Sequence, residues 1–103
     1  MAAFHPETAA MPPFDLSFRL SPYARRCAQK RGKRRDVLIL VHRYGDLERR
    51  AGRRRSALWL SRQACCDLVA GGALPATIDR ARRVEIVVCD DNGVVVDVRD
   101  RAD

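Results

Sequence analysis

The sequence lacks a long apolar run, and this argues against a membrane-spanning segment. Its longest unbroken apolar stretch is VLILV at residues 37 to 41, whereas a helix needs about 20 apolar residues to cross a bilayer. The opening residues, MAAFHPETAAMPPF, also lack the basic and apolar segments of a secretory signal. We therefore expect a cytoplasmic protein that makes no contact with a membrane.

Residues that commonly bind metals or cofactors are scarce. The chain holds two histidines and four cysteines, none of them in a C-x-x-C pair. Cys65 and Cys66 are adjacent, which is a poor geometry for a shared metal or an ordinary disulfide. The sequence also contains no Gly-rich phosphate loop, no G-x-S-x-G and no H-E-x-x-H. We therefore expect reduced thiols, no metal and no cofactor.

Acidic side chains are scarce in the middle of the chain. Residues 19 to 62 contain fifteen Lys and Arg and three acids, whereas residues 63 to 103 contain five Arg and eight acids. The net charge of +7 is therefore concentrated in one half of the chain. Eighteen of the 20 basic residues are Arg, which can bind phosphate through two parallel hydrogen bonds. A coding bias toward Arg is the alternative explanation.

The chain begins with a tail, a short alternating segment and a helix. Residues 1 to 13 are small and proline-bearing, and we expect a flexible tail there. FDLSFRL at residues 14 to 20 alternates apolar and polar side chains, which predicts a half-buried strand or an extended segment. Ser21 and the proline after it are typical of a helix start, and Gly32 of a left-handed helix end near residue 31. The thin apolar face of this helix includes Tyr23.

Residues 34 to 82 predict further helices and a first hairpin. Apolar spacing and Gly45 favour a helix over residues 34 to 44, with a buried strand at VLILV as the alternative. Residues 46 to 60 read as a hairpin around Ala51-Gly52-Arg53. A helix is expected over residues 62 to 70, and a short helical turn over residues 75 to 82.

The C-terminal residues predict a β-hairpin, because two β-branched runs flank a turn that contains Asn92-Gly93. A three-residue loop keeps one face of the hairpin apolar. It pairs Val88 with Val96, Ile86 with Val98 and Glu85 with Arg99. We therefore expect a single α+β domain over residues 14 to 103, with a small antiparallel sheet, a C-terminal β-hairpin and two or three helices packed on one face.

Two basic clusters are candidates for nucleic-acid binding. ARRCAQKRGKRRD at residues 24 to 36 contains seven bases and one acid, and a second cluster falls at residues 49 to 55. Unpaired basic patches are typical of proteins that bind a polyanion, although a solvated helix surface is the alternative. The two clusters support binding if they share one concave face and contradict it if they lie on opposite faces. The predicted binding residues are Arg25, Arg26, Lys30, Arg31, Arg34, Arg35, Arg53 and Arg54.

One cluster could support catalysis. A metal-independent ribonuclease needs a proton acceptor, a proton donor and cations for the phosphate. His42, Arg43 and Tyr44 supply these groups in adjacent positions, with His42 expected near the surface. The alternative is an ordinary, partly exposed histidine. The paired carboxylates Asp90-Asp91 are expected to serve the hairpin turn rather than chemistry.

Three segments together resemble a family. The order of YARRCAQKRG, a helix ending in YG, a hairpin, a helix and VVCDDNGVVVDV is similar to small bacterial proteins with an Arg-Gly-Ile-type helix turn and a closing VVxDxxGxVVTV hairpin. That group resembles the RelE/ParE-like toxin fold, whose better known members bind or cut RNA on the ribosome or target gyrase, and pair with antitoxins. The chain departs from the pattern at Tyr23 (often His), Lys33 (usually Ile) and Asp97 (usually Thr).

Three functions remain open from the sequence. The first is a small cytoplasmic RNA-contacting protein related to RelE-like toxins, with His42 and Tyr44 as catalytic candidates. The second is a non-catalytic interaction module whose basic surface binds an acidic, antitoxin-like protein. The third is a protein without a nucleic-acid role, in which the Arg content reflects coding bias.

Overall fold

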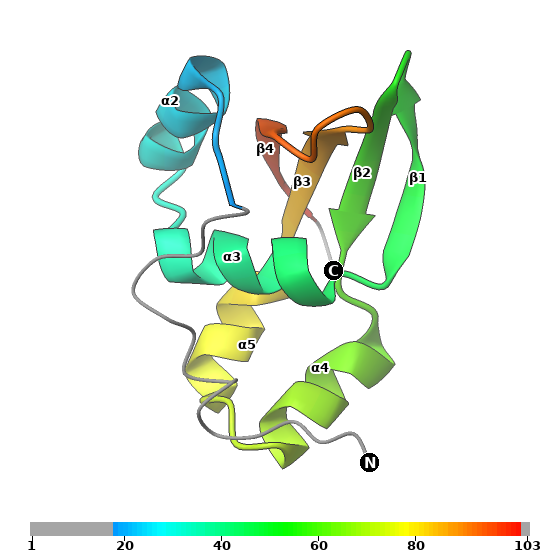
Figure 1. Cartoon of the computed structure of the whole chain (residues 1–103). Helices are drawn as coiled ribbons and strands as arrows, with labels where there is room; N and C mark the ends of the chain where they lie inside the picture. The colour runs from blue at the N-terminus through cyan, green and yellow to red at the C-terminus, as the bar shows by residue number, and fades with distance from the viewer. Residues whose placement is uncertain (1–17, 102–103) are drawn as a thin grey trace.

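The computed structural model describes residues 18–101, which form a four-stranded antiparallel sheet and four helices (Figure 1). The strands lie in the order β1-β2-β3-β4, and the predicted α+β class with its C-terminal hairpin is confirmed. None of these helices is long and apolar enough to cross a membrane. The helices are α2 (Pro22–Lys30), α3 (Arg35–Tyr44), α4 (Arg62–Ala70) and α5 (Pro75–Ala81), and the strands are β1 (Leu47–Gly52), β2 (Arg55–Trp59), β3 (Val84–Cys89) and β4 (Val95–Asp100).

Helices α2 and α4 begin and end on the same local signals. In each, a serine Oγ accepts a hydrogen bond at 3.0 Å from the backbone N three residues later, Ser21 in α2 and Ser61 in α4. Each is followed by a glycine with positive φ, Gly32 (68°) and Gly72 (115°). The residue after that glycine donates back to the carbonyl five residues earlier. These are the expected serine cap and glycine-based stop, so the bounds of both helices could be predicted closely.

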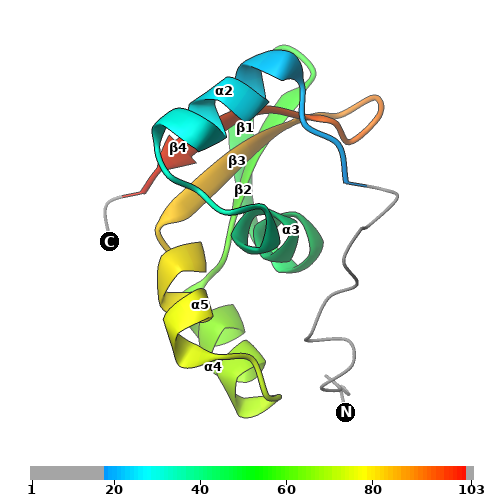
Figure 2. The same ribbon diagram turned by 90° about the vertical axis from the view of Figure 1, so that its left-hand side faces the viewer.

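Helix α3 is the centre of the core. All five residues of VLILV are buried in this helix, so the strand alternative for residues 37 to 41 is wrong. Burial extends around the helix because α3 contacts β2 and β3 on one side and α5 on another, as Figure 2 shows. The chain leaves α3 at Gly45, where an added Cβ would lie 2.6 Å from the carbonyl oxygen of Val41 and 3.4 Å from Cβ of Leu58. The glycine therefore allows β1 to start close to the helix.

The C-terminal hairpin has a bulge that the apolar pattern does not reveal. The predicted pairs of Ile86 with Val98 and of Glu85 with Arg99, which lie nearest the open end of the hairpin, are confirmed. Val88, however, pairs with Val95 and not with Val96, because the register shifts between Val87 and Val88. Apolar alternation could not locate this shift, since either valine would keep the face apolar.

The extended N-terminal segment is confirmed where the structure describes it. Leu20 forms a parallel bridge with Val95 at the outer edge of β4, and the backbone N of Ser21 donates to the carbonyl of Val95 at 2.8 Å. Residues 14–17 of the predicted strand and the predicted tail at residues 1–13 lie outside the described residues.

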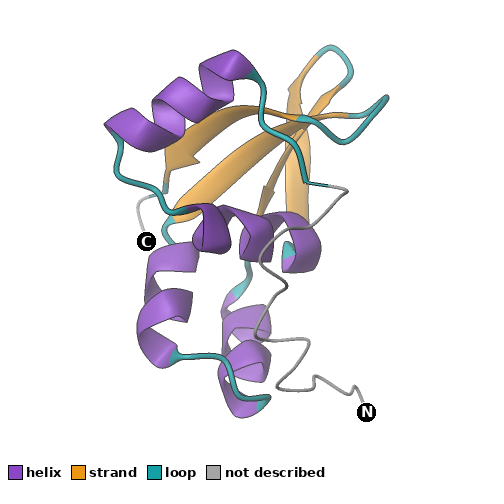
Figure 3. Ribbon diagram, turned by 60° about the vertical axis from the view of Figure 1, so that its left-hand side comes forward, coloured by secondary structure: helices purple, strands orange, loops and turns teal. Residues whose placement is uncertain are grey.

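The two faces of the sheet differ in what covers them. Helix α3 packs on the face that carries Leu58, Ile86 and Val88, and α2 runs along β4 (Figure 3). Helices α4 and α5 lie beyond one end of the sheet, where α5 packs against α3. On the opposite face, Ala57 and Val87 are buried but lie outside the main apolar cluster. Charged side chains cover that face instead.

We expect Gly45→Ala to lower the free energy of unfolding by about 2 kcal/mol, because the new methyl group would overlap the backbone carbonyl of Val41. Gly93→Asn is the matched control: φ at Gly93 is 73°, which asparagine tolerates, and a Cβ there meets nothing within 4 Å. Urea denaturation of both variants measures the difference. Equal stability of the two variants would contradict the close approach at Gly45.

Candidate nucleic-acid interface

Cations outnumber carboxylates two to one in the described part of the chain. All 20 Lys and Arg lie in residues 18–101, together with ten of the 13 acids. Seven of those carboxylates form ion pairs: Asp36, Asp79, Glu85, Asp90, Asp91, Asp97 and Asp100. Within residues 18–101, the following cations have neither a carboxylate partner nor a ring contact: Arg19, Arg25, Arg26, Lys30, Arg53, Arg55, Arg62 and Arg80.

Helix α2 presents a basic surface with one aromatic side chain. Its core side is formed by Ala24 and Ala28, which are 0% and 5% exposed. Tyr23, Arg26 and Lys30 are spaced three and four residues apart, so they share one exposed side of the helix. We call these three residues the helix patch. Tyr23 was expected on the apolar face, but it is 56% exposed, whereas Ala24, Ala28 and Cys27 form the side of the helix that packs against the core.

A carboxylate neutralises the C-terminal end of α2. Arg31 Nη1 and Lys33 Nζ lie 2.9 Å and 2.6 Å from the carboxylate oxygens of Asp100. Hydrogen bonds from Lys33 and then Arg31 lower the pKa of Asp100 below its ordinary value. Arg31, a predicted binding residue, therefore links α2 to the end of β4 and is less available to a ligand than the helix patch.

The other predicted cations of this stretch differ in their surroundings. Arg25 is exposed on the flank of α2 and has no carboxylate partner among residues 18–101. Arg34 pairs with Asp36 at 3.1 Å in an exposed ion pair. The guanidinium of Arg35 lies 5.1 Å from the centre of the Phe18 ring, within the range of a cation–π contact. Arg25 is therefore the most accessible of these three cations.

The second cluster lies at the tip of the β1–β2 hairpin. The turn falls at Arg53-Arg54, slightly later than the predicted Ala51-Gly52-Arg53, and Arg54 has a φ of 56°. Arg53 and Arg55 are exposed and have no carboxylate partner in the described residues. We call Arg53 and Arg55 the tip patch.

The acidic turn of the second hairpin pairs with two further arginines of that cluster. Asp90 lies 2.8 Å from Arg50 Nη1 and also accepts a hydrogen bond from Ser56 Oγ at 2.7 Å. Asp91 lies 3.3 Å from Arg54 Nη1. Asp90 and Asp91 lie in the turn as predicted, and the hydrogen bonds of their carboxylates are made to the neighbouring hairpin.

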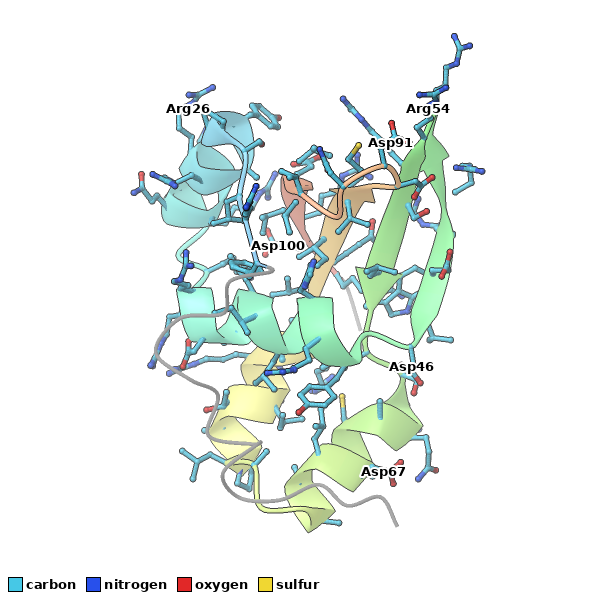
Figure 4. All side chains as sticks on the ribbon, viewed as in Figure 1. Arg26, Asp46, Arg54, Asp67, Asp91 and Asp100 are labelled. Atoms are coloured by element: carbon cyan, nitrogen blue, oxygen red, sulfur yellow. The ribbon has the colours of Figure 1, made fainter. Side chains whose placement is uncertain are left out.

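The two patches lie at one end of the sheet but at opposite edges. Figure 4 shows Arg26 on α2 and Arg54 at the hairpin tip, with Asp91 between them. Helix α2 follows β4, whereas the tip patch belongs to β1 and β2; three strand spacings of about 4.8 Å therefore separate the two edges. The two patches therefore lie at different edges of the sheet and not side by side.

The structure does not bring the two catalytic candidates together. His42 Nε2 donates a hydrogen bond to the carbonyl of Gly93 at 3.1 Å, and the imidazole packs edge-on against Phe18 at 5.5 Å. Tyr44 packs against the apolar cluster. Because residues two apart point to different sides of a helix, the side chains of His42 and Tyr44 diverge. His42 is partly exposed, which fits the alternative of an ordinary histidine, and its hydrogen bond links α3 to the turn of the second hairpin.

A buried carboxylate organises the far face of the sheet. The side chain of Glu85 is 5% exposed, and its oxygens lie 2.6 Å from Arg49, 3.0 Å from Arg101 and 3.7 Å from Arg99. The guanidinium of Arg101 also stacks 4.2 Å from the centre of the Trp59 ring. The sequence predicted Glu85 opposite Arg99, but it gave no signal for the other two arginines, which come from β1 and the end of the chain.

A basic cavity also escaped the sequence analysis. It has a volume of about 450 Å³ and lies between the α2–α3 loop and the end of α5. Its lining residues are Gly32, Lys33, Arg34, Val37, Arg80 and Arg83. Arg80 and Arg83 belong to a segment whose net charge is negative, so charge counted along the chain could not identify them.

The described residues offer no obvious metal centre. No group of three or more His, Cys, Asp or Glu side chains in residues 18–101 is arranged to hold a metal ion. The four cysteines, all within the described residues, form no disulfide; Cys65 is buried and Cys66 is exposed.

We expect Glu85→Gln to lower the free energy of unfolding by about 2 kcal/mol, because it leaves three arginines without their shared negative charge. Asp67→Asn is the control, since it makes the same change of charge at an exposed position of α4. Urea denaturation at neutral pH measures both. The structural role of Glu85 would be contradicted if the two substitutions had the same small effect.

Comparison with known proteins identifies no relative: no family model, curated protein or solved structure matches the chain. The resemblance to RelE/ParE-like toxins therefore stays a prediction. The function of the basic surface has to be argued from its chemistry.

Proposed function

We propose that this protein binds the phosphate backbone of single-stranded RNA through the helix patch and the tip patch, without a catalytic step. The observation that carries the proposal is the helix patch itself. Arg26 and Lys30 have no carboxylate partner among residues 18–101, and they share a helix side with exposed Tyr23.

Electrostatics supports a polyanion as the ligand. Exposed cations repel one another, and acids at helical spacing would normally relieve that repulsion. Helix α2 contains no acid, so its cations stay unneutralised within the described structure. A phosphate backbone would supply the missing negative charge, and arginine suits it because the guanidinium can bind two phosphate oxygens at once.

Tyr23 supports a single-stranded nucleic acid over an acidic protein. Unstacked bases bind to aromatic side chains placed beside cations, and this stacking tolerates any sequence. An acidic, antitoxin-like protein would need the cations but would have no particular use for an exposed tyrosine on the same side. The resemblance to RelE-like proteins supports RNA as the nucleic acid.

The position of His42 does not support a nuclease. Its Nε2 is engaged with Gly93, and Tyr44 lies on another side of α3, so no proton acceptor and donor converge. We therefore propose binding alone.

We expect Arg26→Gln to weaken binding of a fluorescein-labelled single-stranded RNA, measured by fluorescence anisotropy at several salt concentrations. The slope of log affinity against log salt should become shallower by about 0.7, the value for one lost contact to a single-stranded backbone. Arg62→Gln is the matched control, because Arg62 is also exposed without a carboxylate partner in residues 18–101 but lies on α4. Its slope should not change.

Tyr23→Leu separates stacking from charge in the same titration. It should weaken binding about tenfold at every salt concentration and leave the slope unchanged, because stacking releases no counterions. Absence of RNA binding at low salt would overturn the proposal. Equal effects of Arg26→Gln and Arg62→Gln would also overturn it, since binding would then follow net charge alone.

A further inference from the structure

The basic cavity lies just beyond the C-terminal end of the helix that carries the helix patch. Lys30 ends α2, and the chain then passes through Gly32 and Lys33, both of which line the cavity. Tyr23 and Gly32 are nine residues apart, which spans about 14 Å along a helix. An RNA strand that follows the helix patch toward the C-terminal end of α2 would therefore arrive at this cavity.

The lining of the cavity is cationic on both sides. Lys33 and Arg34 come from the α2–α3 loop, and Arg80 and Arg83 come from the end of α5. No acid is among the lining residues, and the floor includes the buried side chain of Val37. The cavity thus brings together four cations that the chain separates by nearly fifty residues.

The neighbouring carboxylates leave these cations incompletely neutralised. Asp100 binds Lys33 at 2.6 Å but also binds Arg31, and Asp79 lies 3.8 Å from Arg83 but 3.0 Å from Arg82. Arg80 has no carboxylate partner in the described structure. Asp36 also pairs with Arg34 at 3.1 Å. Three of the four lining cations therefore have a carboxylate partner, which two of them share with another cation, and Arg80 is the lining cation that is available to a ligand.

The volume indicates the size of the ligand. About 450 Å³ lies in the range of cavities that hold small molecules and exceeds what a single simple ion requires. A phosphate group attached to a ribose would fit this space, with arginine forks on the phosphate oxygens. A backbone phosphate carries one negative charge, whereas a terminal phosphate carries nearly two and is more strongly attracted to four cations.

We propose that the basic cavity binds the terminal phosphate group of the RNA strand that the helix patch holds. This inference rests on the proposed function. The shared chemistry is a terminal phosphate group with nearly two negative charges, which inorganic pyrophosphate also carries. The experiment below distinguishes these sources.

The test compares one labelled RNA sequence with a 5′-phosphate, a 3′-phosphate or hydroxyl groups at both ends. We expect one of the two phosphorylated forms to bind about tenfold more tightly than the hydroxyl form, because the terminal group adds charge-assisted hydrogen bonds. Arg80→Gln should abolish this advantage. Arg53→Gln is the control: it should weaken all three RNAs by the same factor, because the tip patch lies far from the cavity.

Asp100→Asn gives a second variant whose effect cannot arise from misfolding. Its side chain is 56% exposed, and its removal frees Lys33 and Arg31. We expect the phosphorylated RNA to bind more tightly to this variant, while the hydroxyl RNA changes less. Unfolding or loosening of the cavity would have the opposite effect on the phosphorylated RNA.

The outcomes separate this inference from the proposed function. Equal affinity for all three RNAs, with a steep salt dependence, would overturn the terminal-phosphate site and leave backbone binding intact. Binding of pyrophosphate without binding of any RNA would overturn both. A third outcome is that the phosphorylated RNA keeps its higher affinity in the Arg80→Gln variant. That result would show that the terminal phosphate binds elsewhere, and it would overturn the proposed site.

Discussion

The excess of cations over carboxylates is the constraint on which this structure depends. Residues 18–101 contain 20 Lys and Arg and ten acids, so the fold cannot neutralise every cation. Its carboxylates lie where unpaired cations would otherwise destabilise the packing of neighbouring elements. Glu85 is the clearest case, because one buried carboxylate binds three arginines from two segments, β1 and the end of β4, on the far face of the sheet. That face thereby becomes a charged layer over Ala57 and Val87 rather than a second apolar core.

The same constraint determines where unneutralised charge remains. Asp90 and Asp91 bind the first hairpin to the second, and Asp100 binds the end of α2 to β4. These acids stabilise contacts between elements that are distant in sequence. The exposed side of α2 needs no such contact, because Ala24 and Ala28 already attach the helix to the core. The cations of the helix patch are therefore left for a ligand, and this division between structural and available cations supports a binding function.

Local signals in the sequence were sufficient for most of the fold. The serine and glycine residues that flank α2 and α4 act over a few residues, and the apolar face of the last hairpin fixed most of its register. The bulge beside Val87 could not be predicted, because Val95 and Val96 fit the apolar pattern equally well. The surroundings of His42 could not be predicted either, because its hydrogen-bond partner, the carbonyl of Gly93, lies 51 residues away in the sequence.

The candidate site was harder to predict than the fold because it depends on distant contacts. Counting charge along the chain identified Arg26 and Lys30, whose exposure follows from the helix alone. It also selected Arg31 and Arg54, which the structure pairs with Asp100 and Asp91. Charge counting did not identify Arg80, because nearby acids make the net charge of that part of the sequence negative. The fold nevertheless places Arg80 and Lys33 in the lining of the same cavity.

Mapping the RNA contact by NMR tests the central claim most directly. Backbone amide signals of ¹⁵N-labelled protein are followed while an unlabelled single-stranded RNA is added at low salt. The account predicts that the largest changes occur at residues 23–33 along α2 and its following loop, with further changes at residues 53–55 and 80–83, and that α4 is unaffected. Changes centred on α4, or no changes at any RNA concentration, would contradict it.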